Sequence, residues 1–146
     1  MPRDTTLKAL NAAHLALLRV SRGLIGWHVA GMPVLELTTT GRRSGRPHRV
    51  MLTSPVQLGA ALVVVASRGG DDRPPGWLLN VRADPVTRVV VQGRPAVTML
   101  ARVATPGERD RLWPRVVARY PGYARYQSRT ARRIDLVVLE PQERAA

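Results

Sequence analysis

The amino-acid sequence predicts an α+β fold that is mainly β: a closed or half-closed antiparallel barrel of about six strands with peripheral helices. Short apolar runs alternate with glycine- and proline-containing turns along most of the chain, whereas helical spacing of apolar residues is confined to a few segments. Short strands with few helices are typical of a sheet that curls on itself. The 146 residues suffice for one domain with one sizeable core.

The chain begins with a segment, 5–29, whose leucines recur at three- and four-residue steps, which indicates an amphipathic helix. We therefore divide the chain into an N-terminal amphipathic helix, 1–30, and a barrel domain, 31–146. Such a helix either docks on the barrel or lies on a membrane surface, and its composition agrees with both. Glycine and proline at 31–33 end it.

Strand-like segments follow this break. The run 62–65 is entirely apolar, as expected of a strand buried on both faces. The next two strands form a hairpin across a turn that contains Gly93 and Pro95. The expected strands cover 34–39, 49–56, 61–66, 86–92, 96–104 and 134–139.

Three short helices are expected among the strands. The first covers 76–82. The second begins near Pro106, since proline suits a first helical position, and Glu108 near its start complements the helix dipole. Pro121 and Gly122 interrupt it, and the third helix continues from there to about residue 131.

The net charge is +13, and arginine carries nearly all of the positive charge because Lys8 is the only lysine. Many arginines are simply solvated, but this charge also fits an anionic partner: a polyanionic cofactor, a nucleic acid or an acidic lipid surface. The chain has no cysteine, which excludes disulfides and thiolate chemistry and fits a cytoplasmic protein. No metal site is expected, because the three histidines are scattered, and no uncharged run is long enough to span a bilayer.

Two segments with arginine and glycine are suited to anion binding. The first, 38–49, is a turn with four arginines and several hydroxyls, whose glycines allow a ligand to approach the backbone. The second, 66–70, follows the most apolar strand and offers a hydroxyl, a guanidinium and backbone N–H groups. Taken singly, they are equally consistent with a solvated hairpin tip and an ordinary loop. The candidate binding residues are Arg42, Arg43, Ser44, Gly45 and Arg49 in the first segment and Ala66, Ser67, Arg68 and Gly69 in the second.

Aromatic residues mark two further segments. Trp77 and Asn80 share a helix face, where the indole can cover a flat ring and the amide can read a heterocycle edge. Tyr120, Tyr123 and Tyr126 are the only tyrosines of the chain, and their phenols stay protonated at neutral pH and can donate a hydrogen bond or a proton. Buried core aromatics are the alternative interpretation of both segments.

In their order along the chain, these four segments resemble the deazaflavin-dependent nitroreductase family of actinobacteria over about residues 34–141. The resemblance implies a split β-barrel, usually dimeric, that binds coenzyme F-420. It also implies an oxidoreductase that uses the reduced coenzyme to transfer hydride to an electron-poor organic substrate, such as a quinone, an enone or a nitro compound.

The resemblance also implies roles for the candidate residues. A tyrosine hydroxyl, of Tyr126 or Tyr123 first, would stabilise negative charge on the substrate oxygen and donate the proton. His48 lengthens the basic turn, so that either Arg49 or His48 takes the tail-binding position, and the spacing to Ser67 favours Arg49. The phosphate and glutamate tail would lie against Arg42, Arg43, Ser44 and Arg49, the phosphate and ribityl region against Ser67, Arg68 and Gly69, and the coenzyme would be flanked by Trp77 and Asn80, with Tyr120, Tyr123 and Tyr126 on its substrate side.

Three other interpretations remain open at this point. A split-barrel oxidoreductase that binds FMN would need the same phosphate loops. A basic nucleic-acid-binding barrel without enzymatic activity would rest on net charge alone, and it would need stacking aromatics among its basic strands. A protein held peripherally on the inner face of the cell membrane, which reduces a lipid-soluble quinone, is compatible with the main interpretation. A homodimer is expected, and no nucleic acid.

Overall fold

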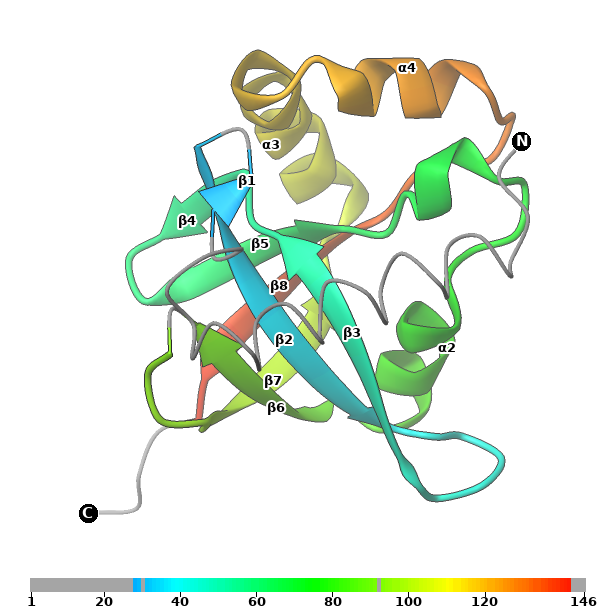
Figure 1. Cartoon of the computed structure of the whole chain (residues 1–146). Coiled ribbons are helices and arrows are strands. Elements are labelled where there is room, and N and C mark those ends of the chain that lie inside the picture. The colour runs from blue at the N-terminus through cyan, green and yellow to red at the C-terminus, as the bar shows by residue number, and fades with distance from the viewer. Residues whose placement is uncertain (1–27, 30, 92, 143–146) are drawn as a thin grey trace.

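The computed structural model describes residues 28–29, 31–91 and 93–142, in which an antiparallel sheet curls into a barrel flanked by helices (Figure 1). The strands are β1 (His28–Val29), β2 (Met32–Thr40), β3 (Pro47–Thr53), β4 (Val56–Leu58), β5 (Ala61–Val65), β6 (Val86–Val91), β7 (Val97–Val103) and β8 (Leu136–Pro141). The helical elements are η1 (Arg68–Gly70), α2 (Gly76–Ala83), α3 (Pro106–Arg119) and α4 (Gly122–Ser128).

The strand order explains why the barrel is split. The strands pair in the order β3–β2–β6–β7–β8–β5–β4, with β1 beside the first residues of β2. The two edge strands, β3 and β4, are consecutive in the chain and joined by Ser54 and Pro55, so the sheet closes through a covalent connection. Within the described residues β3 pairs with β2 alone, which leaves its other edge open toward β5. The predicted mainly β split barrel is therefore confirmed.

Two expected elements were wrong in detail. The strand expected over 49–56 is interrupted after Thr53, because Pro55 has no N–H to donate to a ladder and the Ser54 hydroxyl instead lies 2.9 and 2.8 Å from the carbonyl oxygens of Val56 and Val63. The helix expected over 5–29 ends too late, since His28 and Val29 pair with β2 as β1. The rest of that helix lies outside the described residues.

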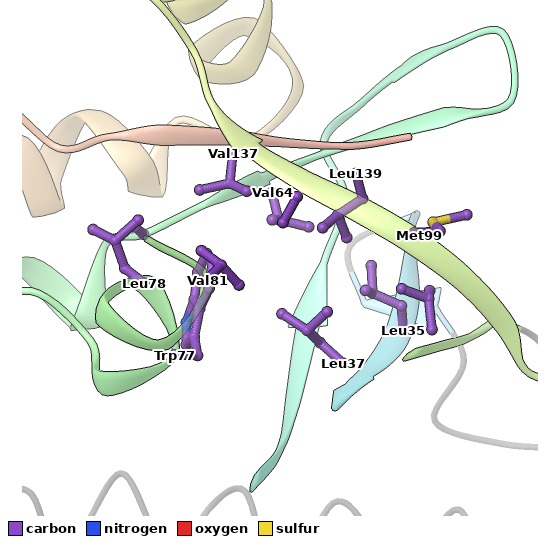
Figure 2. Close-up of a cluster of buried hydrophobic side chains, with 12 residues drawn as sticks. Leu35, Leu37, Val64, Trp77, Leu78, Val81, Met99, Val137 and Leu139 are labelled. Carbon is purple, nitrogen blue, oxygen red and sulfur yellow. The ribbon is translucent and has the colours of Figure 1, made fainter. Parts of the chain in front are cut away.

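The core has two parts, one on each face of β5 and β8. Inside the barrel, Trp77 and Leu78 of α2 point toward Leu37 of β2 and toward Val64 and Val137 of β5 and β8 (Figure 2). On the other face, apolar side chains of β5 and β8 pack against those of α3 and α4. The cluster contains Val63, Val65 and Val138 from the strands, Leu112 and Val116 from α3, Tyr123 from α4, and Ile134, which precedes β8. Since successive side chains of a strand point to opposite faces, a strand between two cores must be apolar throughout, as predicted for 62–65.

The bounds of the two C-terminal helices are explained by the residues at their ends. Thr105 caps α3 through a capping box, in which its hydroxyl accepts from the Glu108 N–H and the Glu108 carboxylate accepts from the Thr105 N–H. The chain turns at Pro121, and α4 then presents its tyrosines toward the open edge of β3. It ends at Ser128, a few residues earlier than expected. No helix in the described part of the chain has the length and hydropathy needed to cross a membrane.

Candidate active site

A groove of about 1050 Å³ lies along the open edge of β3 and is bordered by η1, α2 and α4. Its lining includes residues of the turn between β2 and β3 and of α4, which lie at opposite ends of the molecule in Figure 1. Of the residues that the sequence singled out, its lining contains Arg42, Arg43, Ser44, Arg49, Ser67, Arg68, Gly69, Trp77, Asn80, Tyr120, Tyr123 and Tyr126. Four segments that are separate in the sequence therefore meet at one surface.

Two candidate residues lie outside the groove. Ala66 is fully buried at the end of β5 and belongs to the barrel core. Gly45 borders a smaller hollow of about 380 Å³ beside β6 and β7. Its backbone has φ of +70° and its N–H donates to the Gly41 carbonyl at 2.8 Å, so Gly45 shapes the turn.

The basic turn is held in place by Asn80. The Asn80 Oδ1 atom accepts hydrogen bonds from the Arg42 backbone N–H at 3.2 Å and from Arg42 Nη1 at 3.0 Å. Its Nδ2 atom donates to the Thr39 hydroxyl at 3.0 Å, and the side chain is buried. Both ends of the amide are thus engaged within the protein, which makes Asn80 the link between α2 and the turn, while its contact with a heterocycle edge stays a prediction.

His48 and Arg49 project from opposite faces of β3. His48 pairs with Thr39, and its Nε2 atom lies 3.5 Å from the Ser44 hydroxyl of the turn. Arg49 pairs with Thr38 across the ladder, and its Nε atom lies 4.0 Å from the Glu36 carboxylate. Both border the groove. The choice between Arg49 and His48 for the tail-binding position therefore stays a prediction, with Arg49 preferred for its spacing to Ser67.

The second loop has an unusual backbone. Arg68, Gly69 and Gly70 all have positive φ values, of 46°, 64° and 86°. For Arg68 this conformation costs about 1 kcal/mol or more, and such strain persists only where the surroundings hold it. The Arg68 Nη1 atom lies 3.7 Å from the Asp71 carboxylate, and the hydrogen bond from the Arg73 N–H to that carboxylate, at 2.9 Å, lowers the pKa of Asp71.

Two arginines after α4 contact this loop, and no sequence motif had singled them out. Arg132 donates from three nitrogens to the carbonyl oxygens of Ala66, Ser67 and Asp71, at 3.2, 2.9 and 2.9 Å. Arg129 Nη1 donates to the Gly69 carbonyl at 3.2 Å. The acceptors are backbone carbonyl oxygens, whose positions depend on the fold. No pattern of residues in the sequence therefore predicts these contacts.

The tyrosines form the other end of the groove. Tyr123 packs edge-to-face on both neighbours, with ring centroids 5.3 Å from Tyr120 and 6.0 Å from Tyr126. Its hydroxyl lies 2.7 Å from the hydroxyl of Thr53 on β3, a residue that the sequence analysis missed. Burial raises the pKa of Tyr123, although the Thr53 hydrogen bond opposes this. The Tyr126 ring is half-buried, and its hydroxyl has no hydrogen-bond partner among the described residues.

The chemistry of this groove fits an anionic, flat coenzyme. Arginines and hydroxyls at one end match a polyanionic tail, because guanidinium groups bind phosphate and carboxylate in their own plane. Aromatic rings at the other end match a flat ring system, and the volume of about 1050 Å³ lies just above the usual range for cofactor sites, about 300–1,000 Å³. Trp77 is only 8% exposed, so it contributes mainly to the core and offers little more than an edge to the groove.

Fold and groove together define a split-barrel oxidoreductase of the flavin and deazaflavin class. Residues 11–141 match the family model of the F-420H2-dependent quinone reductases. An F-420H2-dependent quinone reductase of Mycobacterium tuberculosis is 39% identical over 130 residues, which are 86% of each chain. The chain therefore belongs to the F-420H2-dependent quinone reductase family, an oxidoreductase family whose cofactor is coenzyme F-420, and this supports F-420 over the FMN alternative.

Solved structures agree with this assignment. The structure of an F-420H2-dependent reductase has a TM-score of 0.66 and 36% identity, and the match covers 74% of this chain and 94% of the other. A second structure, described as a domain-swapped dimer, has a TM-score of 0.64 and 32% identity, with 88% and 99% covered.

Proposed function

We propose that this protein reduces a quinone or a related electron-poor substrate with the two electrons of reduced coenzyme F-420, and that the groove holds both molecules. The observation that carries the proposal is the meeting of the basic turn, the η1 loop and the tyrosine helix at one surface. When bound, the reduced coenzyme would supply a hydride from its central ring carbon. The protein would bind the coenzyme and the substrate, orient one against the other, and donate a proton to the reduced substrate.

The cationic end of the groove would hold the coenzyme tail. Arg42 and Arg43 lie on an exposed turn whose position is set by Asn80, so their charge is available to phosphate and carboxylate groups. Ser67 and Arg68 would contact the phosphate region. Attraction between exposed charges weakens as salt screens it, so coenzyme affinity should fall with ionic strength.

Of the tyrosines, Tyr126 is the best candidate to donate the proton. The Tyr123 hydroxyl already shares a hydrogen bond with Thr53, and its ring is buried, whereas the half-buried Tyr126 lines the groove and keeps its hydroxyl free within the described residues. A phenol placed at the substrate oxygen stabilises the developing negative charge and then supplies the proton.

The oligomeric state and the cellular location of the protein are also part of the proposal. A homodimer is expected from the family resemblance, and a relative of similar length forms a domain-swapped dimer. A location in the cytoplasm, with peripheral contact to the inner face of the membrane, would bring the groove close to lipid-soluble quinones.

The proposal is tested by titrating the protein with oxidised F-420 and then measuring oxidation of the reduced coenzyme by quinones, enones and nitroaromatics. We expect saturable binding and the highest turnover with a quinone. Tyr126→Phe should lower kcat by about a hundredfold, the usual contribution of a proton donor, with coenzyme affinity retained. Normal turnover of Tyr126→Phe would remove Tyr126 from the mechanism, and absence of F-420 binding would overturn the proposed function.

A further inference from the structure

The loop 66–71 is clamped from behind by one side chain. Arg132 lies outside the groove lining, and its three donor nitrogens reach three carbonyl oxygens, those of Ala66, Ser67 and Asp71. The guanidinium is half-buried and rigid, and its planar fork suits several acceptors held in a fixed arrangement.

This clamp determines which way the peptide groups of the loop point. In a planar trans peptide the C=O and the following N–H point in opposite directions. Because the carbonyls of Ala66 and Ser67 point toward Arg132, the N–H groups of Ser67 and Arg68 point away from it. Ser67 and Arg68 border the groove, so these two N–H groups lie on the side where an anion would bind.

The same region joins the loop to the helix that carries Tyr126. A Cβ atom at Gly70 would lie 2.6 Å from the Tyr126 carbonyl oxygen, so loop and helix are in direct contact there. Arg129, directly after α4, donates to the Gly69 carbonyl. The loop and α4 thus form one packed unit, with Arg132 behind it.

We propose that Arg132 is a positioning residue, which orients the N–H groups of Ser67 and Arg68 toward the coenzyme phosphate and fixes their place relative to Tyr126. This inference rests on the proposed function for the identity of the ligand. The orientation of the loop itself does not depend on a ligand, because every contact of the clamp is made within the protein.

Arg132→Lys tests the geometry of the clamp separately from its charge, since lysine keeps the charge but has one nitrogen instead of a fork. Arg133→Lys is the matched control: Arg133 is exposed and pairs with Asp110. In the protein without coenzyme, we expect amide hydrogen exchange over 66–72 to be about tenfold faster in Arg132→Lys, as for the loss of one hydrogen bond to a charged group, and unchanged in Arg133→Lys. Equal exchange in both variants would overturn the proposal.

Kinetics provide the second readout. The Kd of F-420 and the KM of its reduced form should rise about tenfold in Arg132→Lys, while kcat at saturation changes by less than about threefold, because ground-state binding is what the loop supplies. A fall in kcat alone would contradict the inference. If the unaltered protein binds no F-420, the proposed function fails, but the exchange measurement still decides the role of Arg132. If Arg132→Lys does not fold, the exposed Arg129→Gln variant should show the same pattern more weakly, and normal loop exchange in it would count against the proposal.

Discussion

The basic turn and the η1 loop both carry cations to the groove, but they are held very differently. The turn is exposed, and Asn80 links its Arg42 to α2. The η1 loop is half-buried, has three successive residues with positive φ, and is surrounded by Arg129, Arg132 and Asp71. An exposed cationic turn attracts an anion mainly through charge, whereas a half-buried, tightly packed loop recognises it through the direction of its N–H groups. The two segments should therefore respond differently to mutation, pH and salt.

The largest difference is expected from a glycine substitution in each segment. In Gly70→Ala, the new Cβ would meet the Tyr126 carbonyl at 2.6 Å in a backbone with φ of +86°. We expect the free energy of unfolding to fall by about 2–5 kcal/mol, from backbone strain and overpacking together, with loss of coenzyme binding. Urea denaturation and F-420 titration measure these effects.

Gly45→Ala is the matched change in the turn. Its φ of +70° is similar, but a Cβ there meets no atom within 4 Å. Only the backbone strain of about 1 kcal/mol should therefore appear. Equal destabilisation by the two variants would show that the loop is no more rigidly packed than the turn.

The next effect should come from removing the link between the turn and α2. Asn80→Leu leaves the Arg42 N–H and the Thr39 hydroxyl without the partners that they have now. We expect a loss of about 2 kcal/mol in unfolding free energy, the cost of unsatisfied buried polar groups, and weaker F-420 binding. Asn80→Asp keeps the acceptor for Arg42 and should bind better than Asn80→Leu. Unchanged affinity in Asn80→Leu would mean that the turn needs no support.

The contributions of the two segments to stability should also depend differently on pH. The pKa of Asp71 is lowered below 3.8, first by the hydrogen bond from the Arg73 N–H, so its carboxylate adds stability that is fully present above that pH and is lost as the pH falls through the lowered value. Asp71→Asn should cost about 1 kcal/mol near pH 7, and the difference from the unaltered protein should shrink as the pH falls below 3.8 and disappear below the lowered pKa of Asp71. Glu36→Gln, beside Arg49 on the turn side, is the control. A deficit of Asp71→Asn that persists in acid would contradict this account.

The smallest effect should come from removing the charge of a single arginine in the turn. Arg43→Gln should weaken F-420 binding about threefold at low salt, the value of an exposed ion pair, and make the salt dependence shallower. Arg46 lies in the same turn but outside the groove lining, so Arg46→Gln should change affinity less. Identical losses in both variants would indicate general attraction by net charge instead of contact with the tail.

Much of this architecture could be predicted because it depends on local pattern. Alternation and turn residues located most strands, an all-apolar run identified β5 between two cores, and three-residue spacing placed Tyr123 and Tyr126 on one side of α4. The resemblance to a known family predicted that the four dispersed motifs contact one coenzyme.

What escaped prediction depends on contacts between distant segments. Ser54 and Pro55 looked like part of a strand, because the acceptor of the Ser54 hydroxyl on Val63 is known only from the fold. Arg132 could not be told from the other arginines in the sequence, because its partners are backbone carbonyl oxygens, which carry no residue signature. The bond between Tyr123 and Thr53 joins residues 70 positions apart. Asn80 was singled out as a coenzyme contact, but its bonds to Arg42 and Thr39 could be found only from the fold.

The open edge of β3 has a consequence for how such an enzyme changes over evolutionary time. The wall of the groove formed by Met51, Leu52 and Thr53 belongs to a strand that, among the described residues, is laddered on its β2 side alone. Of these three residues Thr53 is hydrogen-bonded across the groove, to Tyr123, whereas Met51 and Leu52 can be exchanged without breaking a strand-to-strand hydrogen bond on that side. New acceptor molecules could thus be accommodated by replacing a few edge side chains, while the clamp and the turn continue to hold the same coenzyme.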